Sequence, residues 1–230
     1  MTTTRREPQP RNRGASSRIA ARLGAALGLA VLAAIANAQT PTPAPDVAGP
    51  WQASAFGGGW NSITAPYNYV TAAGSAQVGF GNAPAFGVSF GRDATPLVGF
   101  ELSWMQTNPA QQYTTSPPTP IRTVVMNIFT LDSLWYFRRG TFQPYGVFGL
   151  GGASTGSSFG GTNLTIAVGI GVKAFLSPHI AVRADIRWDN MYGNIGHTGD
   201  PAFCDSAGCY FYRTTFYSSL PVTAGLTYAF

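Results

Sequence analysis

Charge is scarce in this chain of 230 residues, since Asp, Glu, Lys and Arg together make up 10% of it. A soluble domain usually has about a quarter of its residues charged. The shortage is expected if lipid, rather than water, covers much of the outer surface. The formal net charge of +5 does not indicate nucleic-acid binding, because the basic excess lies in the first 38 positions. Residues 39–230 hold eight basic and eight acidic side chains, so no basic patch for nucleic acid is expected.

Long apolar runs are missing after the N-terminal segment, so helical membrane spans are not expected, although 45% of all residues are hydrophobic. The N-terminal segment has the three parts of a secretory signal peptide. An arginine-rich lead precedes an apolar run over residues 23–36, and Ala36-Asn37-Ala38 forms an A-x-A cleavage site. We expect residues 1–38 to be a signal peptide that is cleaved before Gln39. No cysteine follows this site, so a lipoprotein anchor is not expected.

The rest of the chain divides into a short tether and one domain. Residues 39–50 contain four prolines and predict an extended periplasmic tether without a core of its own. From Trp51 to Phe230, strand-sized segments are joined by turns. We therefore expect one domain over residues 51–230.

The last eleven residues show the strand pattern most clearly. Every second position from Leu220 to Phe230 is apolar, and the positions between are small or polar. A period of two places these sets on opposite faces of one strand. About ten residues is the length that a tilted strand needs to cross a membrane. A closed barrel in lipid has no edge, and it requires an apolar outer face with aromatic residues at the interface.

Interior segments repeat this alternation. In the segment from Ile180 to Asp189, all four charged residues occupy odd-numbered positions, and the even-numbered positions between them are apolar. Eight strands can be counted in this way from Trp51 onward. Their connections alternate between short turns at 92–96, 138–141 and 176–179 and long polar loops at 61–82, 106–121, 153–163 and 190–216. The sequence predicts an all-β fold, an eight-stranded antiparallel up-and-down transmembrane β-barrel, with its short turns and both termini in the periplasm.

Three stretches of the barrel segment resemble the small OmpA-type eight-stranded outer-membrane barrels. They are Phe142-Gln-Pro-Tyr145 leading into Gly149-Leu-Gly151, the stretch from Val172 to Arg183, and Tyr228-Ala-Phe230. The resemblance implies a bacterial outer-membrane location after export. It also implies that Tyr228 and Phe230 form the signal read by the barrel-assembly machinery. The chain ends with the barrel, so the peptidoglycan attachment of the longer members of the family is not expected.

Seven charged residues lie on the strand faces that we assign to the lumen. An arginine that faced lipid at the bilayer midplane would cost about 2–4 kcal/mol, so these side chains should point inward. Eight strands leave an interior that side chains just fill. We expect a hydrogen-bonded ion network there; the alternative is a gated pore in which the same charges set ion selectivity. The seven residues are Glu101, Asp132, Lys173, Arg183, Asp185, Arg187 and Asp189.

The two cysteines, Cys204 and Cys209, lie in the longest loop. An oxidising periplasm favours a disulfide between them, which would staple a surface hairpin. No second Cys or His pair accompanies them, so no metal site is expected, and no cofactor is expected either. His197 has Asp200 and Asp205 nearby in sequence, but no motif of an outer-membrane hydrolase or protease is present. We therefore expect a protein that is not an enzyme.

The expected role is that of a monomeric structural barrel in the outer membrane. It would contribute to envelope integrity, contact the outer-membrane lipids and display four loops. Adhesion or binding of an extracellular ligand through residues 190–216 falls under the same role. The alternative is a narrow passive porin-like channel for ions or small solutes. Parity also predicts that Ile186→Arg impairs assembly more than a polar replacement of Arg187.

Overall fold

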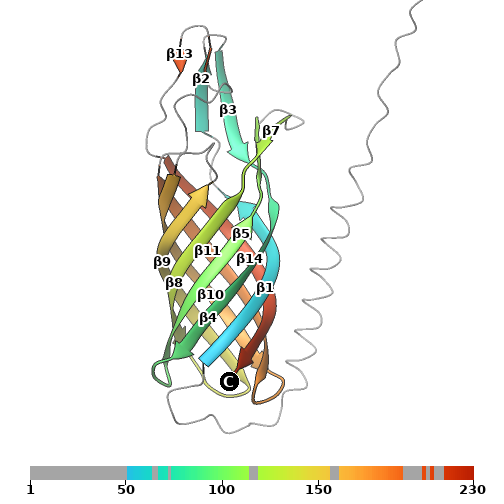
Figure 1. The fold of residues 1–230 in the computed structure, drawn as a ribbon, viewed down its shortest axis with the longest axis vertical. Coiled ribbons are helices and arrows are strands. Elements are labelled where there is room, and N and C mark those ends of the chain that lie inside the picture. Colours follow the sequence, from blue (N-terminus) through green and yellow to red (C-terminus); the bar gives the residue numbers. More distant parts are fainter. Residues whose placement is uncertain are drawn as a thin grey trace, which may run out of the picture.

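The computed structural model describes residues 51–63, 67–71, 74–113, 119–155, 161–193, 204–205, 208–209 and 215–230. Eight antiparallel strands form a closed barrel, which confirms the predicted fold (Figure 1). The barrel strands are β1 (Trp51–Ser62), β4 (Ala83–Asp93), β5 (Val98–Thr107), β8 (Met126–Tyr136), β9 (Phe142–Thr155), β10 (Gly161–Phe175), β11 (Ile180–Gly193) and β14 (Thr215–Ala229).

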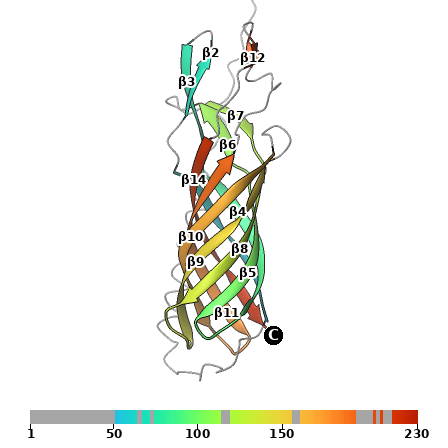
Figure 2. The ribbon, with the colours of Figure 1, turned by 90° about the vertical axis from the view of Figure 1, so that its left-hand side faces the viewer.

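The barrel closes between the first and the last strand. Strand β1 pairs with β14 on one side and with β4 on the other, and the full order is β1-β14-β11-β10-β9-β8-β5-β4. The backbone amide of Phe230 donates to the carbonyl of Trp51 at 2.9 Å, which extends the closing ladder to the end of the chain. Figure 2 shows the strands crossing the wall obliquely. Closure satisfies the backbone polar groups from strand to strand, as a hydrocarbon environment requires.

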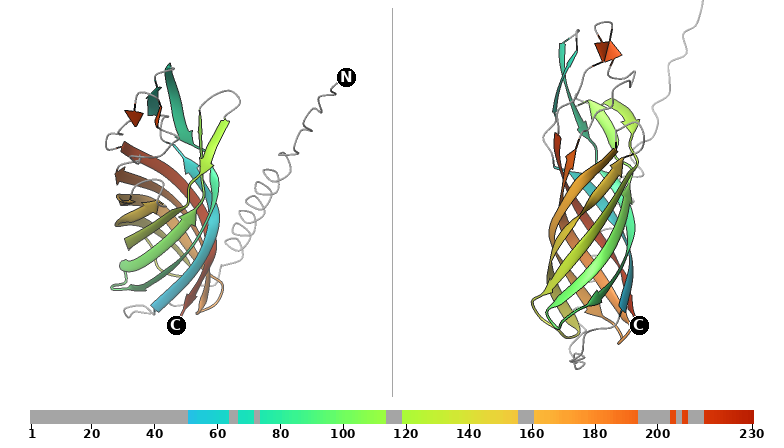
Figure 3. Two further views of the ribbon diagram at one scale, coloured as in Figure 1. Left: turned by 45° about the horizontal axis from the view of Figure 1, so that its top comes forward. Right: turned by 60° about the vertical axis from the view of Figure 1, so that its left-hand side comes forward.

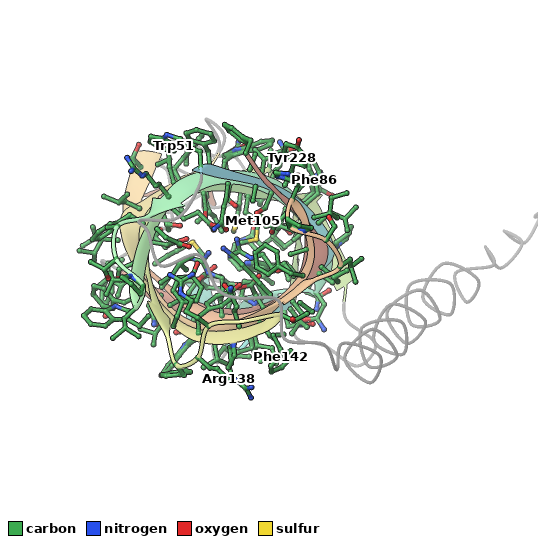
Figure 4. All side chains as sticks on the ribbon, turned by 90° about the horizontal axis from the view of Figure 1, so that it is seen from below. Trp51, Phe86, Met105, Arg138, Phe142 and Tyr228 are labelled. Carbon is green, nitrogen blue, oxygen red and sulfur yellow. The ribbon has the colours of Figure 1, made fainter. Side chains whose placement is uncertain are left out.

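The strand faces follow the alternation in the sequence. Along β4, every second residue is buried and the others, which include Phe86, Val88 and Phe90, are exposed. The same pattern in β8 exposes Phe129, Leu131 and Trp135 and buries the residues between them. Viewed along the barrel axis, Met105 lies inside the ring of strands, whereas the labelled aromatic residues lie outside it (Figure 4). The outer surface is therefore an apolar band suited to lipid.

The two ends of the barrel differ. Short turns join β4 to β5, β8 to β9 and β10 to β11, and they lie at the end that holds Phe230. At the opposite end, the connections that the sequence indicated as polar loops contain further strands: β2 (Tyr67–Thr71), β3 (Gly74–Phe80), β6 (Ala110–Tyr113) and β7 (Thr119–Thr123). They form a four-stranded sheet in the order β2-β3-β6-β7, which stands above the barrel (Figure 3).

This small sheet continues the barrel wall. The amide of Gly81 donates to the carbonyl of Ala110 at 2.8 Å, and the amide of Val124 donates to the carbonyl of Pro109 at 2.9 Å. Gly81 lies between β3 and β4, Val124 lies between β7 and β8, and their partners lie at or just before the start of β6, so these bonds join the small sheet to the segments that enter the barrel. The sequence predicted long polar loops over 61–82 and 106–121, and the structure adds that these connections contain strands that extend the ladder beyond the barrel.

Some sequence predictions fall outside the described residues. These are the signal peptide over 1–38, the tether over 39–50, His197 and most of the loop over 190–216. Within that loop, β12 (Cys204–Asp205) pairs with β13 (Gly208–Cys209). Among the described residues, no helix is long and apolar enough to span a membrane.

Candidate functional site: the lumen of the barrel

The seven charged residues predicted for the lumen are buried, each at most 9% exposed. Five of them come from the neighbouring strands β10 and β11: Lys173, Arg183, Asp185, Arg187 and Asp189. Glu101 comes from β5 and Asp132 from β8, on the other side of the barrel. The closed sheet therefore brings together charges that lie far apart in the sequence.

Arg183 is the centre of the network. Its Nη1 lies 2.7 Å from both carboxylate oxygens of Glu101, and its Nε lies 2.6 Å from Oδ2 of Asp185. The hydroxyl of Tyr145 donates to Oδ1 of Asp185 at 2.7 Å. One guanidinium thus holds two carboxylates, and a tyrosine completes the hydrogen bonding of the second. Charge-assisted bonds of this kind are about twice as strong as neutral ones.

A second group of charges is centred on Asp132. Arg187 donates to both oxygens of Asp132, at 2.9 and 2.8 Å, and Ser103 donates to Oδ2 at 2.8 Å. Asp189 is joined to Arg187 only by a longer ion pair of 3.7 Å between Oδ1 and Nε. Because Arg187 forms a bidentate ion pair with Asp132, a polar replacement of Arg187 would leave the buried carboxylate of Asp132 without its cationic partner. The structure therefore gives no reason to expect such a replacement to be mild.

The third group lies toward the turn end of the barrel. Nζ of Lys173 donates to Gln52 Oε1 at 2.7 Å and to the hydroxyl of Tyr136 at 3.2 Å. Gln52 in turn donates to Asp93 at 3.2 Å, and Arg139 forms an ion pair with Asp93 at 2.7 Å. The chain of contacts therefore runs from the lumen to the short turns.

Arg139 closes this end of the lumen. It lies in the turn between β8 and β9, and its guanidinium stacks on the ring of Tyr136 with 3.6 Å to the centroid. It donates to the carbonyl of Thr95 at 3.1 Å and also to the carbonyl of Pro96, both in the turn between β4 and β5. One side chain thus ties two turns together at this end of the barrel.

Glycines on the inner face make room for the network. A Cβ on Gly171 would lie 2.5 Å from Oδ1 of Asp185 and from the ring of Tyr145. A Cβ on Gly149 would overlap with the carboxylate of Asp132. Both glycines therefore leave space that the bulky charged side chains occupy, which is the packing role of glycine in a narrow barrel.

Away from the turn end, the lumen holds an apolar cluster beside buried polar side chains such as Thr107, Thr165 and Ser219, whereas the sequence predicted a polar filling throughout. Trp60 and Tyr217 stack with ring centroids 5.6 Å apart, and Phe80 meets Tyr217 edge-on at 5.0 Å. Phe80 comes from β3, one of the strands above the barrel. The apolar plug consists of Trp60, Phe80, Ala85, Met105, Val124, Met126, Ile128, Ala153, Met191 and Tyr217.

A small cavity lies where the ion network meets the apolar plug. It measures about 20 Å³, and its lining includes Arg187, Asp189 and Thr130 as well as Met105 and Ile128. A space of this size holds about one water molecule. Oδ1 of Asp189, which accepts no hydrogen bond from the described residues, offers a polar partner for it.

The sequence analysis missed several members of the network. Asp93 has the inward parity of β4, but it was read as part of a turn. Tyr145 carried no charge to draw attention to it, and the faces of the Gly-rich first strand, which holds Gln52, could not be assigned from the sequence. Arg139 lies in a turn, where no periodicity applies, so no sequence signal marked it. The described residues contain no cluster of three or more His, Cys, Asp or Glu that could hold a metal ion.

The other predicted site residues lie outside the lumen. Tyr228 and Phe230 are exposed on the outer face at the turn end, and their rings stack at 6.1 Å. His179 stacks on Tyr228 at 6.1 Å, and its Nδ1 is 2.9 Å from the carbonyl of Ala229. Cys204 lies directly opposite Cys209 in the β12–β13 pair.

Comparison with known proteins gives one family and several related folds. Residues 24–201 match the family described as the outer membrane protein beta-barrel domain. The outer membrane protein OprG from Pseudomonas aeruginosa is similar in structure, with 14% identity, a TM-score of 0.56 and coverage of 80% of this chain and 96% of that one. The outer membrane protein W of E. coli has 17% identity, coverage of 80% and 98%, and a TM-score of 0.45. No curated protein matches the chain. At these identities the likeness concerns the fold.

Proposed function

The chain belongs to the outer membrane protein β-barrel family, which places it in the bacterial outer membrane, and we propose that it serves there as a closed structural barrel that displays its outer strands and loops. The observation that carries the proposal is the filling of the lumen. Within the described residues, an ion network fills the lumen toward the turn end, an apolar plug packs beyond it, and the cavity lined by both measures about 20 Å³. These packed side chains would obstruct the passage of solutes.

The ion network and the apolar plug would each oppose the passage of an ion, for different reasons. A hydrated ion would have to displace buried ion pairs such as Arg183–Glu101, which leaves charges without partners at a cost of about 3–5 kcal/mol. Beyond them it would meet the stacked rings of Trp60 and Tyr217, where it would lose its hydration. The rival function, a narrow passive pore, requires both fillings to move.

Conductance across planar bilayers tests the proposal. We expect the wild-type barrel to give no steady single-channel current, while a general porin in the same bilayer does. A double variant, Arg183→Ala with Trp60→Ala, weakens both fillings and should raise the frequency of brief openings. A steady, ion-selective current through the wild-type protein would favour the pore instead.

Display is the second part of the proposed role. The sheet β2-β3-β6-β7 extends the wall above the membrane, and the loop over 190–216 carries the pair β12–β13. These elements would offer an extracellular ligand a surface on a monomeric scaffold anchored in the lipid. Replacing residues 194–214 by a short Gly-Ser turn should abolish adhesion of whole cells without loss of the folded barrel. Unchanged adhesion would remove this loop from the proposal.

The proposal includes neither catalysis nor a cofactor. The buried carboxylates Glu101, Asp132 and Asp185 accept hydrogen bonds from arginines, which supports a structural role for them. The proposal also covers export and assembly. Residues 1–38 would be removed before Gln39, and the barrel-assembly machinery would recognise Tyr228 and Phe230. N-terminal sequencing of the outer-membrane form should begin at Gln39, and Phe230→Ala should slow assembly in cells.

A further inference from the structure

On the outer surface of the barrel, the exposed charges of the described side chains are all positive and lie at one end. Among the side chains that the structure describes, the charged residues exposed on the outside are Arg92 and Arg138. Both lie at the turn end, one at the end of β4 and the other in the turn after β8. The described acidic side chains Asp93, Glu101, Asp132, Asp185 and Asp189 are all buried.

Arg92 lines one end of a groove on the outer surface. The groove measures about 560 Å³ and crosses β1, β4, β5 and β8. Its volume is within the range of about 300–1,000 Å³ that is typical of small-molecule sites. Besides Arg92, its side walls are formed by Trp51, Phe90, Phe100, Leu102 and Leu131.

The register of the strands orders these residues along the membrane normal. Arg92 is paired with Trp51 on β1 and with Phe100 on β5, at the periplasmic end. Two residues further into the membrane, Phe90 is paired with Leu102, which is itself paired with Leu131. The groove therefore has a cationic end at the periplasmic interface and an apolar body that runs toward the midplane.

The position of Arg92 is partly set by its aromatic neighbour. Its guanidinium lies over the ring of Trp51 with 5.7 Å to the centroid, and Trp51 stacks on Phe90 at 5.0 Å. No carboxylate in the described part of the chain forms an ion pair with it. Its donors therefore remain available to an external anion, while its hydrocarbon stem and Trp51 form one wall of the groove.

We propose that this groove binds one anionic phospholipid of the periplasmic leaflet. The guanidinium of Arg92 would hold the phosphate, because its planar fork of donors matches phosphate oxygens. One acyl chain would lie between Phe90 on one side and Phe100 and Leu102 on the other. The occupant comes from the periplasmic leaflet because the cation lies at the turn end, which is the periplasmic end of such barrels.

Native mass spectrometry of the delipidated barrel in mild detergent tests the site, with phosphatidylglycerol and phosphatidylcholine as probes. We expect the wild-type protein to retain one phosphatidylglycerol in preference to phosphatidylcholine. Arg92→Gln should weaken the binding of phosphatidylglycerol roughly tenfold, the loss expected for one charge-assisted contact. Arg138→Gln is the matched control and should bind as the wild type does.

Two further variants distinguish the contribution of the apolar groove to lipid binding from that of the Arg92 charge. Leu102→Trp fills the apolar part of the groove and should weaken the binding of both lipids. Arg92→Lys keeps the positive charge but loses the planar guanidinium, so it should lose part of the preference for phosphatidylglycerol over phosphatidylcholine. Heat-modifiable gel mobility verifies that each variant is folded. Equal binding by Arg92→Gln and the wild type, or an equal loss with Arg138→Gln, would show a non-specific lipid annulus and overturn the proposal.

Discussion

Arg183 and Glu101 lie 82 positions apart in the sequence and bind each other across the full width of the barrel. Nη1 of Arg183 is 2.7 Å from both oxygens of the carboxylate, and the two strands, β11 and β5, stand opposite each other in the closed order of eight. The pair therefore joins two walls that share no backbone hydrogen bonds. It acts as a strut through the centre of the lumen.

Glu101→Gln should destabilise the barrel by about 3–5 kcal/mol, because Arg183 would keep only one of its two carboxylates in a buried setting. Urea unfolding in lipid vesicles measures the change in the free energy of unfolding. Arg138→Gln, on the exposed surface, should change it by less than about 0.5 kcal/mol. In a double-mutant cycle, Glu101→Gln and Arg183→Gln should be coupled; strict additivity would show that the strut contributes nothing.

Ile186→Arg and Arg187→Gln should both destabilise the barrel, for different reasons. Ile186 is 46% exposed on the outer face, so an arginine there would cost about 2–4 kcal/mol in lipid. Arg187→Gln would remove two hydrogen bonds from buried Asp132. In a detergent micelle, which lets a long cationic side chain reach water, the effect of Ile186→Arg should shrink while that of Arg187→Gln persists. The folded fraction on unheated gels measures both, and the same dependence on lipid at both positions would contradict the assigned faces.

Gly171→Ala should cost about 1–3 kcal/mol, the usual penalty of overpacking, because the new methyl group would meet the Tyr145–Asp185 hydrogen bond. Gly146→Ala is the matched control on the outer face. Its Cβ would lie 3.5 Å from the nearest side chain, Phe137, which is ordinary van der Waals contact. Thermal unfolding followed by gel mobility compares the two variants. A drop in stability as large for Gly146→Ala as for Gly171→Ala would argue against a space-making role.

Cys204 and Cys209 should form a disulfide in the exported protein, because they face each other in the β12–β13 pair and the periplasm is oxidising. Iodoacetamide should label neither cysteine before reduction and both after it. Because the pair lies in a loop, Cys204→Ser should leave barrel stability unchanged and increase cleavage of the loop by added protease. Labelling of both thiols without reductant would be incompatible with the bond.

In the strands that alternate clearly, the sequence by itself determined which residues face lipid and which face the lumen, while the faces of the Gly-rich first strand stayed unassigned. In the segment from Ile180 to Asp189, the alternation assigned every side chain to a face, and the burial pattern of β11 agrees with it. The reason is local: in an extended strand, neighbouring side chains point in opposite directions whatever the strand pairs with. The count of barrel strands and the positions of the short turns follow from the same periodicity.

Only the tertiary structure decided which inward side chains meet. Parity cannot reveal that Arg183 binds Glu101 while Arg187 binds Asp132, since the closing of the sheet sets the levels at which the strands face one another. Nor could it show that Arg139, from a turn, closes one mouth, or that Phe80, from a strand above the barrel, packs into the other. These contacts join distant segments across a common interior, and no repeat along the chain records them.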